Sequence, residues 1–105
     1  MKGEITMAKY RKNPIVVEAE LFEMSMEDGH ALYDVATSTF VGFCPKGYAS
    51  LAHVYRKPAI KTLEGWYEVE VGKHYIVTGV EGERYPVEKR IFERTYEKIS
   101  DQGEI

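Results

Sequence analysis

The sequence contains a single cysteine, Cys44, and no long hydrophobic run. One cysteine cannot form an intramolecular disulfide bond, which suits a reducing compartment. No stretch approaches the roughly 18 to 20 apolar residues that a membrane-spanning helix needs. Residues 1–12 are mixed polar and charged and lack the apolar core of a secretory signal. We therefore expect a cytoplasmic protein that does not enter the membrane.

A strong positive charge is also missing. Fourteen lysine and arginine residues stand against seventeen aspartate and glutamate residues, so the formal net charge is −3 at pH 7. The chain as a whole is therefore not attracted to nucleic acid or to an anionic membrane. Lys9, Arg11 and Lys12 cluster ahead of Pro14, but we interpret them as solvated charge in front of an edge strand rather than as a nucleic-acid patch.

The residues that could bind a metal or act as a nucleophile lack suitable spacing. His30, His53, His74 and Cys44 include no pair at the roughly two to five residues typical of structural zinc sites. Cys44 has no glycine elbow or helix N-terminus positioned to activate its thiol, which favours a small apolar role in the core. We predict no metal site, no cofactor and no covalent catalysis.

The glycines and carboxylates indicate a catalytic site no more clearly than the histidines and the cysteine do. Gly79 and Gly82 lie in a GVEGE segment, which lacks the lysine of a phosphate-binding loop and carries acids that would repel an anion, so a turn is favoured. Paired carboxylates could support acid–base catalysis, although alternation on a solvent-facing strand explains them equally well. The carboxylates considered are Glu68, Glu70, Glu81, Glu83 and Glu88. We therefore predict no catalytic residue.

Aromatic residues, in contrast, are abundant, with eight tyrosines, four phenylalanines and one tryptophan. We favour a β-rich core as the explanation and keep a recognition surface as the alternative. Residues 59–63 and 66–71 flank a Glu64-Gly65 turn, and residues 74–78 predict a third strand. An apolar stripe at helical spacing then predicts a C-terminal helix, and it comprises Val87, Ile91, Phe92, Tyr96 and Ile99.

The first half of the chain adds further predicted elements. Residues 14–22 alternate between apolar and polar, which predicts a strand with one face towards a core. Ser25 and Asp28 resemble a capping box and predict a short amphipathic helix over residues 25–36. Residues 40–44 and 51–56 predict two more strands, which end at Pro45 and before Pro58.

These elements predict one α+β domain over residues 1–105. We expect a small, mostly antiparallel, twisted sheet of five or six strands with two short helices packed on one side. Residues 1–8 are expected to be an extension, with Met7 as an alternative start, and residues 100–105 a frayed tail. The exposed edges of such a sheet would also allow a homodimer.

One large aromatic residue, Trp66, falls on a strand face that should otherwise be wet. By alternation it shares that face with two glutamates, so it either covers the first helix or anchors an interaction. Residues of a following loop could extend the same surface. The candidate interaction residues are therefore Trp66, Glu68, Glu70, Arg84 and Tyr85.

Two segments resemble a known family. Residues 60–97 contain IKTLEG and VEVGKHYIVTGVEGERYPVEKRIFERTYE, and residues 10–20 read YRKNPIVVEAE. Both are similar to a family of small phage and prophage proteins, the PGDYG-domain family. The name-giving proline-glycine-aspartate turn reads Val71-Gly72-Lys73-His74 here, so no role of that aspartate carries over. The family has no assigned activity, and the resemblance implies a compact domain in a phage setting without implying any chemistry.

We therefore predict a non-enzymatic phage or prophage accessory protein that binds a host or phage protein in the bacterial host cytoplasm. The alternative is a small-ligand binding protein, in which tyrosines between helix and sheet would stack a nucleotide-like ligand. A hydrolase that uses carboxylates is a third and less favoured alternative.

Overall fold

The protein is mostly β-structure in a computed structural model that describes residues 7–11, 14–47 and 52–99. The described residues form β1 (Glu18–Leu21), β2 (Gly29–Asp34), β3 (Phe40–Pro45), β4 (Val54–Thr62), β5 (Gly65–Glu68), β6 (His74–Thr78), β7 (Arg84–Glu88) and α1 (Lys89–Thr95). The predicted α+β fold, with two helices on one sheet of five or six strands, is therefore wrong. Seven strands form two sheets, and one short helix follows them in the described part of the chain.

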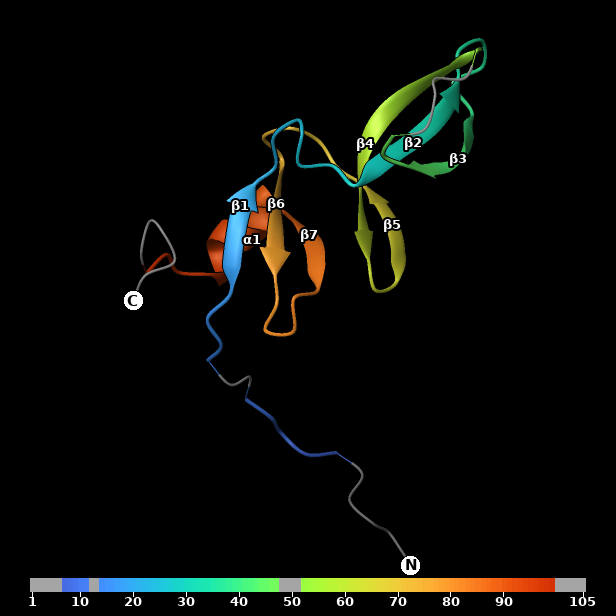
Figure 1. The fold of residues 1–105 in the computed structure, drawn as a ribbon. Helices are drawn as coiled ribbons and strands as arrows, with labels where there is room; N and C mark the ends of the chain where they lie inside the picture. The colour runs from blue at the N-terminus through green and yellow to red at the C-terminus, as the bar shows by residue number, and fades with distance from the viewer. Residues whose placement is uncertain (1–6, 12–13, 48–51, 100–105) are drawn as a thin grey trace, which may run out of the picture.

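The second sheet is inserted between neighbouring strands of the first. The three-stranded sheet has the order β1-β6-β7 and the four-stranded sheet the order β3-β2-β4-β5 (Figure 1). Every strand pair is antiparallel. The chain thus leaves the first sheet after β1, builds the second sheet from β2 to β5, and returns to pair β6 with β1.

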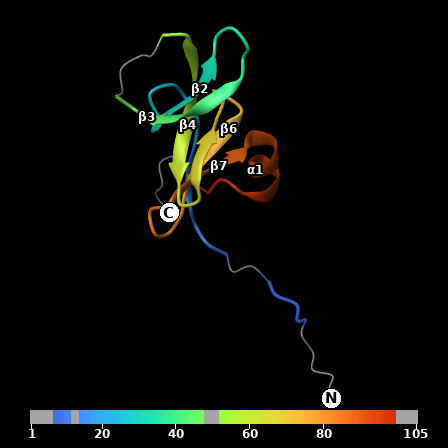
Figure 2. The same ribbon diagram turned by 90° about the vertical axis from the view of Figure 1, so that its right-hand side faces the viewer.

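The hydrophobic core lies between the two sheets. Neighbouring residues of β6 point to opposite faces of the three-stranded sheet. On one face Tyr75 stacks on Phe92 of α1, with ring centroids 4.2 Å apart, so the helix covers that side (Figure 2). On the other face Ile76 joins a buried cluster with residues of the second sheet and of the connections, namely Phe22, Ile60 and Val69.

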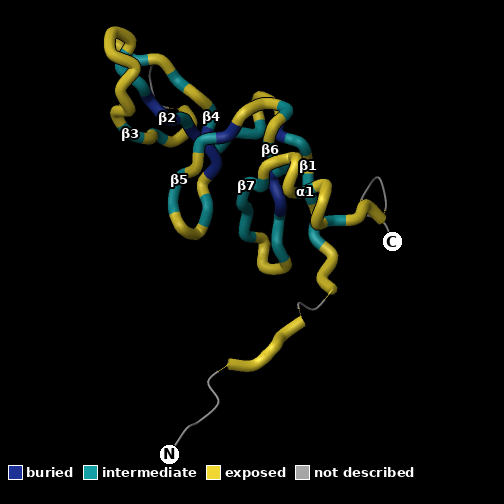
Figure 3. Tube along the Cα trace, turned by 180° about the vertical axis from the view of Figure 1, so that it is seen from behind, coloured by how far each residue is buried: buried dark blue, intermediate teal, exposed yellow. Residues whose placement is uncertain are grey.

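Burial is uneven along the molecule. Figure 3 shows that the outer end of the four-stranded sheet and much of α1 are exposed or half-buried. The buried apolar residues of the described chain are Phe22, Ala31, Leu32, Ala59, Ile60, Val69, Ile76 and Val77. The outer part of the second sheet therefore depends on strand pairing and on side-chain contacts at its surface more than on the shared core.

The helix predicted over residues 25–36 is a turn followed by strand β2. This strand is central in its sheet, because it pairs with β3 on one side and with β4 on the other. A helix here would contain Gly29, which costs about 1 kcal/mol relative to alanine. Pairing on both sides outweighs the weak local preference for a helix.

Strand β4 continues through Pro58, at which the sequence predicts a stop. The Pro58 carbonyl accepts a hydrogen bond from the Val69 N–H at 3.0 Å, on the side of the sheet where β5 lies. The missing N–H of proline points to the same side as its carbonyl. The missing N–H therefore faces Val69, just beyond the end of β5 at Glu68, and the pairing of β4 with the central strand β2 loses no hydrogen bond.

The first strand and the last helix are both shorter than predicted. Only Glu18–Leu21 pairs with β6, because Thr78, opposite Glu18, is the last residue of that strand. At the other end Val87 belongs to β7, and Ile91 is 44% exposed although the helical stripe predicts it in the core. The predicted tail at residues 100–105 and most of the predicted extension at residues 1–8 lie outside the described residues.

Asp28 joins the two sheets. Its backbone N–H donates to the Ala59 carbonyl at 2.9 Å, and one carboxylate oxygen accepts from the Lys61 N–H at 2.9 Å. The other carboxylate oxygen accepts from the Arg84 guanidinium of β7 at 2.8 Å. One carboxylate thereby binds a strand from each sheet and sets their relative position.

Candidate interaction surface

One face of the four-stranded sheet collects aromatic side chains from all four strands. We call this surface the aromatic face; its residues are Tyr33, Phe40, Phe43, Tyr55 and Trp66. The register sets Tyr33 of β2 directly opposite both Phe40 of β3 and Tyr55 of β4. Residues directly opposite each other carry their side chains on the same side of a sheet. The core residue Ile60 is on the other side, so the aromatic face points away from the core.

A β-bulge in β3 places both of its phenylalanines on this face. The register of β2 and β3 shifts between Leu32 and Tyr33, so that Gly42 pairs with Leu32 and Phe40 pairs with Tyr33. Without the shift, Phe40 and Phe43 would point to opposite faces, because they are three residues apart. The extra residue allows the two rings to meet edge to face, with centroids 5.0 Å apart.

The five rings form a continuous row. Tyr55 stacks on Tyr33 with centroids 5.5 Å apart and planes 17° apart, and Tyr33 meets Phe40 edge to face at 5.6 Å. At the other end Phe43 stacks on Trp66 with centroids 6.0 Å apart and planes 12° apart. Such pairs stabilise by about 0.5–1.5 kcal/mol each beyond their burial. The row is therefore held by its own contacts as well as by the sheet.

Small residues lie beneath the rings. Gly29, Ala31 and Ala59 share the aromatic face by register, and all three are buried. A methyl group at Gly29 would lie only 2.6 Å from a ring carbon of Trp66 and would also collide with the Cys44 carbonyl. The absence of a side chain at Gly29 thus makes room for the indole ring.

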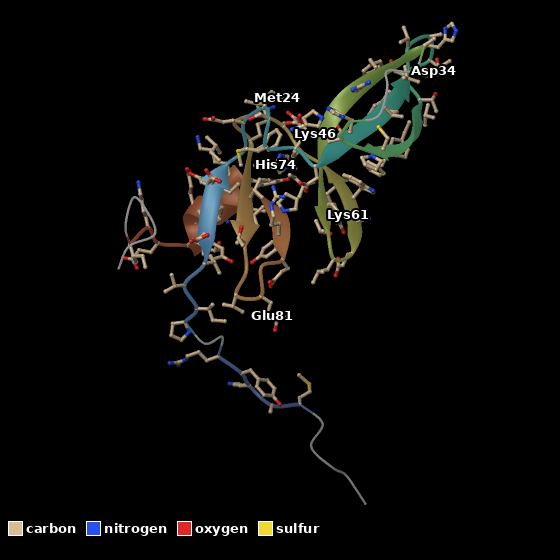
Figure 4. All side chains as sticks on the ribbon, viewed as in Figure 1. Met24, Asp34, Lys46, Lys61, His74 and Glu81 are labelled. Carbon is tan, nitrogen blue, oxygen red and sulfur yellow. The ribbon has the colours of Figure 1, made fainter. Side chains whose placement is uncertain are left out.

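Charged groups border the row and give it a local positive character. The Lys57 ammonium lies 5.0 Å from the centre of the Tyr33 ring, and that of Lys61 lies 5.2 Å from the Trp66 ring. Glu68 accepts a hydrogen bond from the Tyr33 hydroxyl and pairs with Lys57 at 3.8 Å. The hydrogen bond to Glu68 raises the pKa of the Tyr33 hydroxyl. In Figure 4, Asp34 and Lys61 mark the two ends of the sheet that carries these groups.

The aromatic face is substantially exposed. Phe40 is 46% exposed, Phe43 38% and Tyr55 36%, while Tyr33 and Trp66 are half-buried. A contiguous exposed aromatic surface with a polar border is typical of an interaction site. The rings offer apolar area in fixed positions, and the lysines offer charge at the border.

The structure brings together two of the five predicted interaction residues. Trp66 and Glu68 both belong to the aromatic face or its border, and Trp66 covers Gly29 of its own sheet rather than a helix. Glu70 lies beyond β5 and pairs with Lys73 at 3.3 Å. Glu68 and Glu70 thus pair with different lysines, Lys57 and Lys73.

The other two predicted residues have different surroundings. Arg84 binds Asp28 at the junction of the sheets, as described above. Tyr85 in β7 lies beside Tyr96, and burial together with a hydrogen bond to that tyrosine raises the pKa of Tyr85. Neither residue extends the aromatic face.

Sequence reasoning missed four residues of the aromatic face, which are Tyr33, Phe40, Phe43 and Tyr55. Tyr33 falls in the segment predicted to be a helix, and the bulge conceals the common side of the two phenylalanines. The surplus of aromatic residues was the signal that could have pointed to a recognition surface, but composition does not say which rings meet.

The space between α1 and its sheet holds a second aromatic stack. Phe92 stacks on Tyr75 and on Tyr96, with centroids 4.2 and 4.5 Å apart. These rings fill the place in which tyrosines would have to stack a nucleotide-like ligand. An open recess of about 550 Å³ lies nearby, and its lining is mostly charged: Glu70, Gly72, Lys73, His74, Glu88, Lys89, Arg90 and Glu93.

The candidate metal ligands come from different strands: His30 lies on β2, Cys44 on β3 and His74 on β6. His30 and Cys44 lie opposite each other on β2 and β3, a proximity that sequence spacing did not suggest. His74 accepts a hydrogen bond from the Glu70 N–H at 3.0 Å, in the three-stranded sheet. Within residues 7–11, 14–47 and 52–99, no three histidine, cysteine, aspartate or glutamate side chains are grouped as they would be around a metal ion.

Comparisons with known proteins add no relative: no protein-family model, curated protein or solved structure matches the chain. In the part of the chain that the structure describes, no helix has both the length and the apolar character to cross a membrane.

Proposed function

We propose that the protein is a non-enzymatic binding protein that docks a protein partner on the aromatic face. The proposal rests on the continuous row of rings from Tyr55 to Trp66, several of which are well exposed. Clustered aromatic side chains carry much of the binding energy at protein interfaces. Their positions here are fixed by mutual stacking, so little conformational entropy is lost when a partner binds.

The arrangement of the rings favours a protein over a nucleic acid. A base binds by stacking on an open ring face. Tyr33 and Tyr55 already stack on each other, as do Phe43 and Trp66, and lysine ammonium groups lie over two of these rings. The stacked ring faces are therefore not open to a base, whereas the exposed parts of the rings can still pack against apolar side chains. The formal net charge of −3 also disfavours a nucleic acid.

The border of the aromatic face indicates the chemistry of the partner. Lys57 and Lys61 stand beside the rings, and the Lys57 side chain is 47% exposed. Electrostatic complementarity then favours a partner whose apolar patch is flanked by carboxylates. The resemblance of residues 60–97 to phage and prophage proteins supports a partner from a phage or its bacterial host, met in the host cytoplasm.

Capture and titration with matched variants test this proposal. The wild-type protein is immobilised, a partner is captured from phage-infected cells, and its affinity is then measured by calorimetry. Phe43→Ala removes a central ring and should weaken binding by about thirtyfold or more. Tyr67→Ala is the control, because Tyr67 is 45% exposed on β5 but alternates with Trp66 and so lies on the opposite face.

The charged border provides a second arm of the test. Lys61→Glu should weaken binding, and the loss should shrink as salt is added. Affinity that is the same for wild type, Phe40→Ala and Phe43→Ala would contradict the proposal. Tight binding of a single-stranded oligonucleotide that depends on these phenylalanines would replace the protein partner by a nucleic acid.

A further inference from the structure

The outer side of β1 is an open edge of the three-stranded sheet. β1 pairs with β6 on one side, and no strand of the described residues lies on its other side (Figure 1). The Phe22 N–H, directly after β1, donates to the His74 carbonyl at 2.8 Å. In an antiparallel pair the backbone groups of successive residues point alternately to the two sides of the strand. Those of Ala19 and Leu21 therefore point outwards, away from β6, and offer donors and acceptors to a further strand.

The side chains of β1 divide between the two faces of its sheet. Ala19 and Leu21 are half-buried and lie on the face of Tyr75, which α1 covers through its packing against β6 and β7. Glu18 and Glu20 lie on the opposite face and are exposed. A strand added beside β1 would thus set one row of its side chains next to apolar residues and the other row next to carboxylates.

The carboxylates on β1 disfavour a second copy of the strand and favour a basic partner. When two identical antiparallel strands pair around a twofold axis, each side chain stays on its own face of the sheet, so residues that meet differ by an even number. In the registers centred on Glu18, Ala19 or Glu20, a glutamate then lies opposite a glutamate. Like charges directly opposite each other destabilise a strand pair. Lysine or arginine in the same places would be complementary to the carboxylates.

The other sheet edges are less suited to an added strand. Pro86 lies within β7 and Pro45 ends β3, which also contains the bulge, so neither edge offers a regular row of donors. β5 has four residues and begins directly after a turn. β1 is equally short, but Ile15 and Val17 continue its alternation before its first pair with β6. A strand on the outer side of β1 can therefore extend past the end of β6.

We propose that β1 binds an extended segment of a partner protein, which adds an antiparallel strand to the three-stranded sheet and carries lysine or arginine at every second position. The backbone of this segment bonds to Ala19 and Leu21, and only an extended peptide matches such a row of groups. Its apolar side chains lie opposite these two residues, and its basic side chains lie beside Glu18 and Glu20. The aromatic face belongs to the other sheet, so the two surfaces bind independently.

Titration of the isotope-labelled full chain with a synthetic peptide of alternating valine and lysine residues, followed by NMR, tests this proposal. The peptide should bind with a Kd below about 1 mM, and added salt should weaken it. The amide groups of Ala19 and Leu21 should gain protection from hydrogen exchange. Because the valines lie opposite these residues, N-methylation of the valine nitrogens should abolish binding, whereas N-methylation of the lysine backbone nitrogens should preserve it.

A charge exchange tests the chemistry of the partner. The double variant Glu18→Lys/Glu20→Lys should bind the valine–lysine peptide at least about tenfold more weakly and should bind a valine–glutamate peptide instead. Both glutamates are exposed, so the melting temperature should stay the same. Phe43→Ala, on the aromatic face, should bind the peptide as the wild type does. The proposal is overturned if the wild type does not bind at about 1 mM peptide, if binding survives methylation of the valines, or if the double variant keeps its affinity.

Discussion

Gly29 determines at the scale of one residue how the aromatic face is built. The residue lies under the Trp66 ring and against the Cys44 carbonyl, where no side chain fits. Its φ does not lie in the left-handed region, so the requirement for glycine comes from space and not from backbone conformation. A glycine that weakens a predicted helix is thus required by a close contact within a sheet.

Gly29→Ala should therefore displace Trp66 and disturb its stacking on Phe43. We expect a loss of about 1–3 kcal/mol in the free energy of unfolding, typical of overpacking at a tight site. Urea denaturation followed by tryptophan fluorescence would measure both effects, because Trp66 is the single tryptophan of the chain. Gly42→Ala is the control, since a methyl group there meets no atom within 4 Å. Equal stability of the two variants would show that the indole ring can move aside without cost.

The carboxylate of Asp34 makes the stability of the turn after β2 depend on pH. Its carboxylate accepts the Ala36 and Thr37 N–H groups at 2.8 and 3.0 Å, and these hydrogen bonds hold the pKa of Asp34 below its ordinary value of 3.8. A lowered folded-state pKa means that the ionised form stabilises the fold. This contribution is complete well above the unfolded-state pKa and is lost as pH falls through the lower, folded-state pKa.

Asp34→Ala should accordingly reduce stability near neutral pH, and the difference from wild type should shrink as the solution is acidified below about pH 4. Urea denaturation at a series of pH values would give the two curves. Asp34→Asn keeps an oxygen acceptor but cannot ionise, so it should lose the pH dependence and retain part of the stability. If the difference in unfolding free energy between Asp34→Ala and the wild type stayed constant down to low pH, ionisation of Asp34 would be excluded as its source.

At the scale of elements, the two phenylalanines Phe22 and Phe92 illustrate different kinds of packing. Phe22, in the connection after β1, is completely buried in the core between the sheets. Phe92 is half-buried and stacks between Tyr75 and Tyr96 on the outside of the three-stranded sheet. The helix α1 has no buried residue at all, so it contributes less to the core than its apolar stripe predicts.

Phe22→Ala should cost roughly 3–5 kcal/mol, because it leaves a cavity in a small core. Phe92→Ala should cost clearly less, since the site can relax towards solvent and only stacking and partial burial are lost. Thermal and urea denaturation of the two variants, followed by circular dichroism, would compare them. A larger loss for Phe92→Ala would mean that α1 holds the three-stranded sheet together more strongly than its exposure indicates.

At the scale of the whole molecule, stability should vary along the four-stranded sheet. Ile60, in the inner half of β4, is buried between the sheets, whereas Tyr55, in its outer half, is 36% exposed. The inner half is also bound to the first sheet through the Asp28–Arg84 contact. Local opening is easiest where few buried contacts oppose it. The end of the molecule that carries Asp34 and Val54 should thus open before the end that carries Ile60.

Amide hydrogen exchange would show this gradient. We expect the slowest exchange in β6 and in the inner half of β4, faster exchange near Asp34 and Val54, and the fastest in residues 14–17, which precede the paired part of β1. Uniform protection along β4 would contradict the gradient and indicate one cooperative unit.

The sequence by itself determined the elements that depend on adjacent residues. The turn between β4 and β5, the strand β6 and a short C-terminal helix were all predicted, because alternation and turn chemistry act over a few residues. Trp66 was also singled out as a large ring on a face that should be wet. These features could be predicted because each is recorded in a short run of sequence.

Only the tertiary structure decided which side chains lie together on the exposed face of the four-stranded sheet. Whether residues 29–34 form a helix or a strand depends on β3 and β4, which pair with them from both sides. Phe40 and Phe43 share a face because of a bulge that exists only in the pairing with β2. Long-range register decides which side chains meet, and local propensity is too weak to specify that register. The aromatic face is for this reason a property of the folded molecule.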